Sequence, residues 1–188
     1  MSTVRAAIET VDGPAAKIGP GTGQGDRRTK GLGPGGEGKE NPAEHWIVKY
    51  STDSKEDYAA QLDFFKIEVG SLSKKSALIE YASKLSQKKP VYRKSTRKEE
   101  KRVYFKKPNK HPVLRWDKAF LKSAGAEITD RYIFTFYPTD TIKKLKLLEE
   151  KALARDKKDM SDVQKTVFTV VPSKSGGYEY KLSSIKYN

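Results

Sequence analysis

The sequence predicts an α+β fold: a single domain built on a largely antiparallel sheet that two or three helices cover on one face. Strand-like and helix-like patterns interleave in the first half of the chain, and the end of the chain is typical of a hairpin around Ser175–Gly177. This order argues against a regular parallel sheet, in which strands and helices alternate throughout. A chain of 188 residues is long enough for one such core.

Glycine and proline set the first part of the chain apart. Residues 13–42 contain ten of the fourteen glycines and four of the nine prolines. Such a stretch buries too little apolar surface to offset the entropy lost on ordering, so we expect a disordered Gly/Pro-rich tail or linker over 1–44 and the α+β domain over 45–188. The run Gly33–Lys39 resembles a phosphate-binding loop, but Glu40 replaces the required hydroxyl residue, and no nucleotide cofactor is expected.

The first elements follow from local patterns. Trp46–Tyr50 is typical of a strand, and Ser54 begins a helix whose apolar face carries Tyr58, Leu62 and Phe65. The segment Lys66–Val69 predicts a strand that Gly70 ends. Residues 76–85 fit a strand or a helix, and we favour the strand.

The middle of the chain predicts a strand, a turn and a short helix. Arg102–Lys106 alternates apolar and polar residues, and residues 107–112 have the composition of a turn. Residues 113–116 fit a returning strand. Asp117 is expected to cap a short helix that Gly125 ends.

The last third contains the clearest patterns. Arg131–Tyr137 is β-branched and aromatic throughout, and residues 139–155 predict a long helix. Its buried stripe is expected to hold Ile142, Leu145, Leu148 and Ala152. A short helix fits 160–165, and the hairpin over 167–187 is expected to have a bulge at Ser183-Ser184, where the alternation slips.

Positive charge is concentrated in residues 88–118, which we call the basic segment. It contains thirteen Lys or Arg against three acids, a net charge of +10 out of +14 for the chain. Cations that displace counterions and aromatic rings that stack on bases are what a nucleic-acid surface needs. The polyanion-binding candidates are Arg93, Lys94, Arg97, Lys98, Lys101, Arg102, Tyr104, Lys106, Lys107, Lys110 and Arg115. A solvated loop, or lysines that protect a strand edge, explains the same composition.

A second cationic group is expected on one side of the long helix. It consists of Lys144, Lys151, Arg155 and Lys158.

Candidates for catalysis are few. The chain has no cysteine and two histidines, His45 and His111, and both are expected to be solvated loop residues. Aspartates 156, 159 and 162 have a spacing that a metal could use, but helix capping explains them better. We therefore predict no catalytic residue, no metal and no cofactor, and a protein that is not an enzyme. An enzyme would need a deep pocket with acids such as Glu68 or Glu80.

The sequence bears on location in two ways. No apolar run approaches the roughly 20 residues that span a bilayer. Glu9 and Asp12 interrupt any signal-peptide core at the N-terminus. As written, the chain is expected to be cytoplasmic, and an envelope association would require a longer precursor.

Five segments resemble an uncharacterised family of small proteins common in planctomycete-type bacteria. They are Trp46–Gly70 with its run Gln61–Gly70, Leu121–Gly125, Ile133–Pro138, Lys165–Phe168 and Gly177–Tyr180. The resemblance covers most of residues 46–187. It implies a compact α+β module that follows a glycine-rich tract, has no assigned activity or site residues, and travels with envelope machinery.

Two function classes follow. The favoured one is a non-catalytic interaction module, a binding or adaptor domain for a protein partner, because the resemblance spans the whole domain. The alternative is sequence-nonspecific nucleic-acid binding through the basic segment. An exposed apolar patch and indifference to salt would indicate the first class, and steep salt dependence would indicate the second. Neither the partner nor the oligomeric state is predicted.

Overall fold

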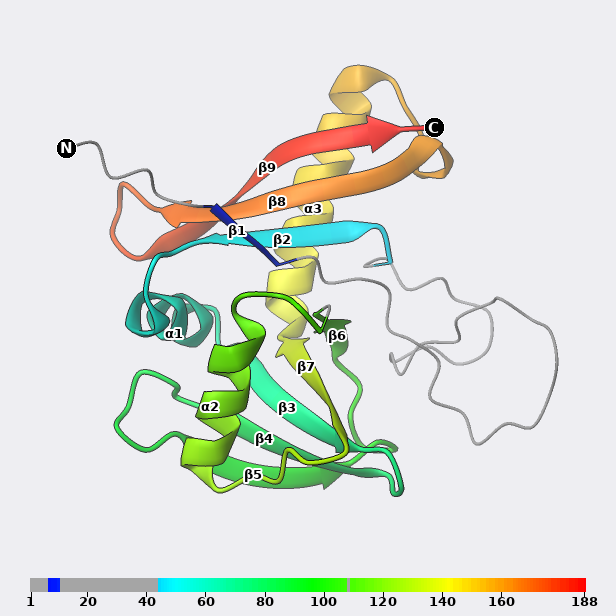
Figure 1. The fold of residues 1–188 in the computed structure, drawn as a ribbon. Coiled ribbons are helices and arrows are strands. Elements are labelled where there is room, and N and C mark those ends of the chain that lie inside the picture. The colour runs from blue at the N-terminus through cyan, green and yellow to red at the C-terminus, as the bar shows by residue number, and fades with distance from the viewer. Residues whose placement is uncertain (1–6, 11–43, 108) are drawn as a thin grey trace, which may run out of the picture.

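A computed structural model describes residues 7–10, 44–107 and 109–188 and has the predicted α+β class (Figure 1). The described strands form two sheets rather than the single sheet expected. The four-stranded sheet has the order β1 (Ala7–Thr10), β2 (Trp46–Ser51), β8 (Val163–Pro172), β9 (Tyr178–Tyr187). Within it, β2 and β8 are parallel and the other pairs are antiparallel.

The five-stranded sheet is antiparallel throughout. Its order is β5 (Val91–Thr96), β4 (Leu78–Ser83), β3 (Glu68–Ser73), β7 (Arg131–Tyr137), β6 (Val103–Lys106). Figure 1 shows α2 lying across one face of this sheet. The basic segment therefore supplies both edge strands, β5 and β6, and the beginning of α2.

The helices begin and end largely as the sequence indicates. They are α1 (Lys55–Phe64), α2 (Leu114–Ala124), α3 (Thr139–Asp156) and a 3-10 turn, Met160–Asp162. The Ser54 side chain accepts a hydrogen bond from the Asp57 N–H at 3.1 Å, which confirms the predicted start of α1. Gly125 ends α2 with φ = 94°, a conformation that glycine adopts without strain.

Several boundaries differ from the sequence prediction. Ala7–Thr10 pair with β2, although they fall in the stretch assigned to a tail, and the rest of residues 1–43 lies outside the described residues. Residues 113–116 begin α2 instead of forming a strand, and Asp117 lies inside that helix instead of capping it. The predicted helix at 160–165 is only the 3-10 turn.

Gly70 was expected to end a strand, but β3 runs through it. A Cβ at position 70 would lie 2.5 Å from the Phe136 ring of the adjacent strand. Glycine is needed here because an aromatic ring packs against the backbone, and not because the chain turns.

The C-terminal hairpin and its bulge are confirmed. Val167 pairs with Ser184 and Phe168 with Leu182, so Ser183 is the extra residue.

The two halves of the chain exchange their first strands. Strand, helix and hairpin follow one another as β2, α1, β3, β4 and again as β7, α3, β8, β9. However, β2 pairs with β8 of the second half, and β7 pairs with β3 of the first half. The Tyr50 and Tyr137 hydroxyls, at the ends of the exchanged strands, lie 2.5 Å apart in the interior. Neither sheet is complete without residues from both halves.

A buried carboxylate holds α3 against the four-stranded sheet. Glu149 is fully buried and accepts hydrogen bonds from His45 Nε2 at 2.7 Å, Trp46 Nε1 at 2.9 Å and the Thr166 hydroxyl. Burial alone would raise the pKa of Glu149, but these hydrogen bonds outweigh it and place the pKa below the usual 4.5. The apolar stripe predicted for this helix lies next to Glu149, with Leu145 and Ala152 buried and the other two members partly buried.

A second buried charge lies between the sheets. Asp117 of α2 lies 3.1 Å from the Lys107 ammonium and accepts a hydrogen bond from the Tyr58 hydroxyl at 3.1 Å. Both members of the ion pair are almost fully buried, and Lys107 also donates to Thr135 Oγ1 at 3.5 Å. The pair joins the end of β6 to α1, α2 and β7.

We expect K107M to lower the free energy of unfolding by about 3–5 kcal/mol, because it leaves the Asp117 carboxylate buried without its cation. Urea denaturation measures this loss. Adding D117N should recover a large part of it, since an amide is neutral and can still accept from Tyr58. An equal loss in the single and double variants would contradict the assignment.

We expect E149Q to lower the free energy of unfolding at pH 7 by about 1.5–3 kcal/mol, the range for hydrogen bonds to a charged group. The folded pKa of Glu149 is depressed, so its contribution is present above pH 4.5 and is lost as the pH falls through the folded value. The difference between wild type and variant should therefore shrink in acid. Urea denaturation at several pH values checks this, and a constant difference would contradict it.

Candidate polyanion-binding surface

The face of the five-stranded sheet turned away from α2 is aromatic. Tyr81, Tyr104, Phe134 and Phe136 cluster there and are at most 2% exposed. Charged side chains of β3, β5 and the loop 97–102 lie on this face. We call these side chains the cover of the aromatic face, and they include Arg93 and Arg102 of the basic segment.

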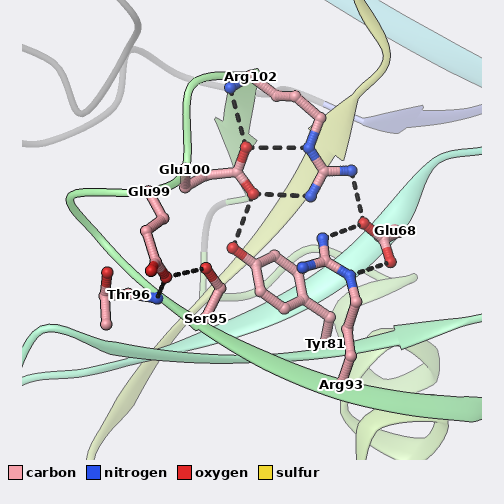
Figure 2. A network of polar contacts seen from close by, with 8 residues as sticks. All are labelled: Glu68, Tyr81, Arg93, Ser95, Thr96, Glu99, Glu100 and Arg102. Carbon is pink, nitrogen blue, oxygen red and sulfur yellow. Dashed lines mark hydrogen bonds and ion pairs between the residues drawn. The ribbon is translucent and has the colours of Figure 1, made fainter.

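Figure 2 shows the polar network that holds the cover in place. Arg93 donates two hydrogen bonds to Glu68, from Nε at 2.9 Å and from Nη2 at 2.5 Å. Arg102 pairs with Glu100 at 2.7 Å and with Glu68 at 2.5 Å. The Tyr81 hydroxyl donates to Glu100 at 2.7 Å, so the network is anchored to the aromatic face.

The arginines also lie against aromatic rings. The Arg93 guanidinium carbon is 3.8 Å from the centre of the Tyr81 ring, and Arg102 is 5.4 Å from that of Phe136. Lys106 approaches Tyr132 in the same way, at 5.0 Å. These are cation–π distances, and they fix the cationic groups on the protein surface.

The acids of the network are ionised at neutral pH. Burial raises the pKa of Glu68, but Arg93 and Arg102 more than offset it, and the pKa lies below its usual value. The same balance lowers the pKa of Glu100, through Arg102 and Tyr81. Two arginines thus face two carboxylates, and the network contributes no net charge to a polyanion site.

The structure therefore divides the predicted polyanion-binding residues. Tyr104 and Lys107 are buried, at 2% and 3% exposure, and cannot contact a ligand at the surface; this corrects the sequence prediction. Arg97 lines a cavity of about 10 Å³ over Leu72 and Phe134, large enough for one water at most. Arg93 is exposed but paired with Glu68, and the exposed candidates outside the network are Lys94, Lys98, Lys101, Lys110 and Arg115.

Helix α2 presents a cationic face, of which only Arg115 was among the predicted polyanion-binding residues. Arg115, Lys118 and Lys122 are exposed, while Asp117 points into the core. On strand β5, Lys94 lies beside Glu80, on the side of the sheet that α2 covers. We call the three exposed cations of α2, Arg115, Lys118 and Lys122, the basic helix face. These cations are spaced three and four residues apart, so the sequence would have predicted a shared face if residues 114–124 had been assigned to a helix.

The second cationic group, on α3, is also divided. Lys144, Lys151 and Lys158 are exposed, but Arg155 is bound to Asp156 at 2.8 Å. This group contributes less charge than the sequence predicted.

The histidines are not solvated loop residues. His45 bonds Glu149, and His111 is buried with its Nδ1 accepting from the Val113 N–H at 3.3 Å.

The spaced aspartates act in capping and pairing. Asp159 and Asp162 form the predicted cap around the 3-10 turn, and Asp156 accepts from Arg155 and Tyr187. Glu68 and Glu80, named as acids for an enzyme site, are each paired with arginine, Glu80 with Arg131 at 2.7 Å. Within the described residues, no group of three potential ligands could hold a metal ion.

Comparison with known proteins adds no relative: no family model, curated protein or solved structure matches the chain. The resemblance to the planctomycete-type family stays a prediction. None of the helices in the described part of the chain has the length and apolar character needed to cross a membrane.

We expect E68Q to lower the free energy of unfolding by about 1–3 kcal/mol, because both arginines of the cover lose a charged acceptor. Guanidinium denaturation measures the change. K98S, which removes an exposed lysine outside the network, should stay within about 0.5 kcal/mol of wild type. If the two variants were equally stable, the network would not hold the cover.

Proposed function

We propose that the protein is a non-catalytic binding module whose ligand is a polyanion, the phosphate backbone of a nucleic acid, and that the basic helix face is the contact surface. The observation that carries this proposal is the helix face itself: three exposed cations on α2 without an exposed acid among them. The network of Figure 2, by contrast, is internally neutralised.

The spacing of the cations suits a charged chain. Arg115, Lys118 and Lys122 rise by about 4.5 Å and about 6 Å along the helix axis. Each can reach a different phosphate, and each contact releases counterions, so binding gains free energy from entropy at low salt. Contacts to phosphate carry no sequence information, and the expected binding is sequence-nonspecific.

Exposed apolar residues give less support to a partner that binds through a hydrophobic patch. Within the described part of the chain, the large ones are Phe64, Val91, Tyr92, Leu147 and Met160. They belong to α1, β5, α3 and the 3-10 turn, and of these five only Val91 and Tyr92 are adjacent in the chain. Scattered side chains of this kind are ordinary on soluble proteins.

Fluorescence anisotropy of labelled single- and double-stranded oligonucleotides, titrated at several salt concentrations, tests the proposal. Wild type should bind at low salt, with log affinity falling by roughly 0.7–0.9 per contacted phosphate for each unit of log salt. R115S/K118S/K122S should lose at least about tenfold in affinity and lower the slope by roughly 2–3.

A matched variant separates a defined surface from diffuse charge. K144S/K151S/K186S removes the same number of exposed cations from α3 and β9. It should keep nearly the wild-type slope. Equal losses in the two variants, or no binding at the lowest salt, would reject the basic helix face as the site.

A further inference from the structure

Strand β5 forms a free edge of the five-stranded sheet. It pairs with β4 on one side, and no other strand of the described residues pairs with it on the other. A free edge offers main-chain donors and acceptors that a further strand can use.

The hydrogen-bond pattern shows which residues of β5 point their backbone outward. The Arg97 N–H donates to the Ala77 carbonyl at 2.7 Å, at the end of a β4–β5 register without a shift. Bonded and non-bonded pairs alternate in an antiparallel ladder, so Arg93 and Ser95 bond to β4. The N–H and C=O groups of Tyr92 and Lys94 therefore point away from the sheet.

The end of the edge confirms this alternation. Thr96 has the same phase as Lys94, and its N–H donates to the Glu99 carboxylate at 3.0 Å. Its carbonyl accepts from the Glu99 N–H, also at 3.0 Å. The Glu99 side chain and backbone thus bond the outward N–H and C=O of Thr96. The outward backbone groups of Tyr92 and Lys94 remain available to a further strand.

The side chains around the open part are apolar and cationic. Val91 and Tyr92 are 42% and 39% exposed, and they are the adjacent pair among the large exposed apolar residues. Lys94 belongs to the open part, and Lys98 and Lys101 follow in the loop after β5; all three are exposed and have no ion pair within the described part of the chain.

A second copy of the chain is a poor occupant. Two copies can pair their β5 edges antiparallel about a two-fold axis. The outward groups of both residues are used when Tyr92 of one copy pairs with Lys94 of the other. That register places Arg93 directly opposite the Arg93 of the other copy, where the two guanidinium groups repel each other and disturb the pairing of each with its own Glu68.

We propose that the β5 edge is a docking site for an extended acidic segment of a partner protein, which adds a strand antiparallel to β5 through the backbone of Tyr92 and Lys94. Main-chain hydrogen bonds supply part of the affinity, as in other cases of strand addition. Acidic side chains on one face of the segment lie beside Lys94, and apolar side chains on the other lie beside Val91.

Amide hydrogen exchange followed by NMR tests the proposal with a blocked nine-residue peptide of alternating Glu and Val. In the free protein, the amides of Tyr92 and Lys94 should exchange fast and those of Arg93 and Ser95 slowly. Saturating peptide should slow exchange at Tyr92 and Lys94 by at least about tenfold, because an ordered hydrogen bond protects each amide. Unchanged exchange at both amides would overturn the proposal.

Two matched comparisons separate strand addition from attraction between charges. K94P removes an outward N–H, which an edge strand tolerates, and should abolish peptide binding, whereas K94Q keeps the N–H and should lose only a few-fold. A peptide N-methylated at its glutamates, which lie opposite Tyr92 and Lys94, keeps its charge but loses the main-chain donors that face β5, and it should bind at least about tenfold more weakly. Equal binding of the two peptides would show that charge alone attracts them and would overturn the proposal.

The same variants keep this site distinct from the nucleic-acid surface. R115S/K118S/K122S should lose oligonucleotide binding and keep peptide binding, and K94P should still bind oligonucleotides. If an oligonucleotide, and not the peptide, protected Tyr92 and Lys94, the edge would belong to the nucleic-acid site and the docking proposal would be wrong.

Discussion

The buried ion pair between Lys107 and Asp117 determines how α2 presents its charge. Asp117 is an acid in a helix that is otherwise cationic on its polar side, and its carboxylate must lie next to the Lys107 ammonium in the interior. Breaking a buried pair costs more free energy than any single surface contact supplies, so the rotation of the helix is fixed. With Asp117 inward, Arg115, Lys118 and Lys122 face solvent. The surface that we propose for nucleic acid thus depends on an interaction in the core.

The basic segment has three physical roles that its composition does not separate. Arg93 in β5 and Arg102 in the following loop are paired with Glu68 and Glu100 and cover the aromatic face of the sheet. Lys107 is part of the core. Lys106 is half-buried against Tyr132, and the remaining lysines and Arg115 are exposed. Arginine suits the cover because its planar group can pair with a carboxylate and stack on a ring at once, whereas lysine stays strongly hydrated at the surface.

The exchange of first strands between the halves ties the two candidate surfaces to one core. Because β7 lies in the same sheet as β3 and β4, its residues pack against both α2 and the aromatic face. The buried Tyr50–Tyr137 contact joins the two sheets at the ends of the exchanged strands. The docking edge and the basic helix face both belong to the five-stranded sheet and the helix that packs on it. They would recognise different ligands, because β5 offers a row of backbone N–H and C=O groups and α2 offers separated cationic side chains.

Local patterns in the sequence determined the fold class and most of the elements. Capping at Ser54, the aromatic strand 131–137, the long helix from Thr139 and the bulged C-terminal hairpin follow from short-range physics, and the structure confirms them. The sequence also located the positive charge. Tertiary structure decided the pairing of strands into two sheets and the passage of β3 through Gly70. It also decided which cations of the basic segment are paired, buried or exposed. These outcomes depend on contacts between residues far apart in the chain, such as Glu68 with Arg93 or Lys107 with Asp117, and composition and periodicity contain no information about such partners.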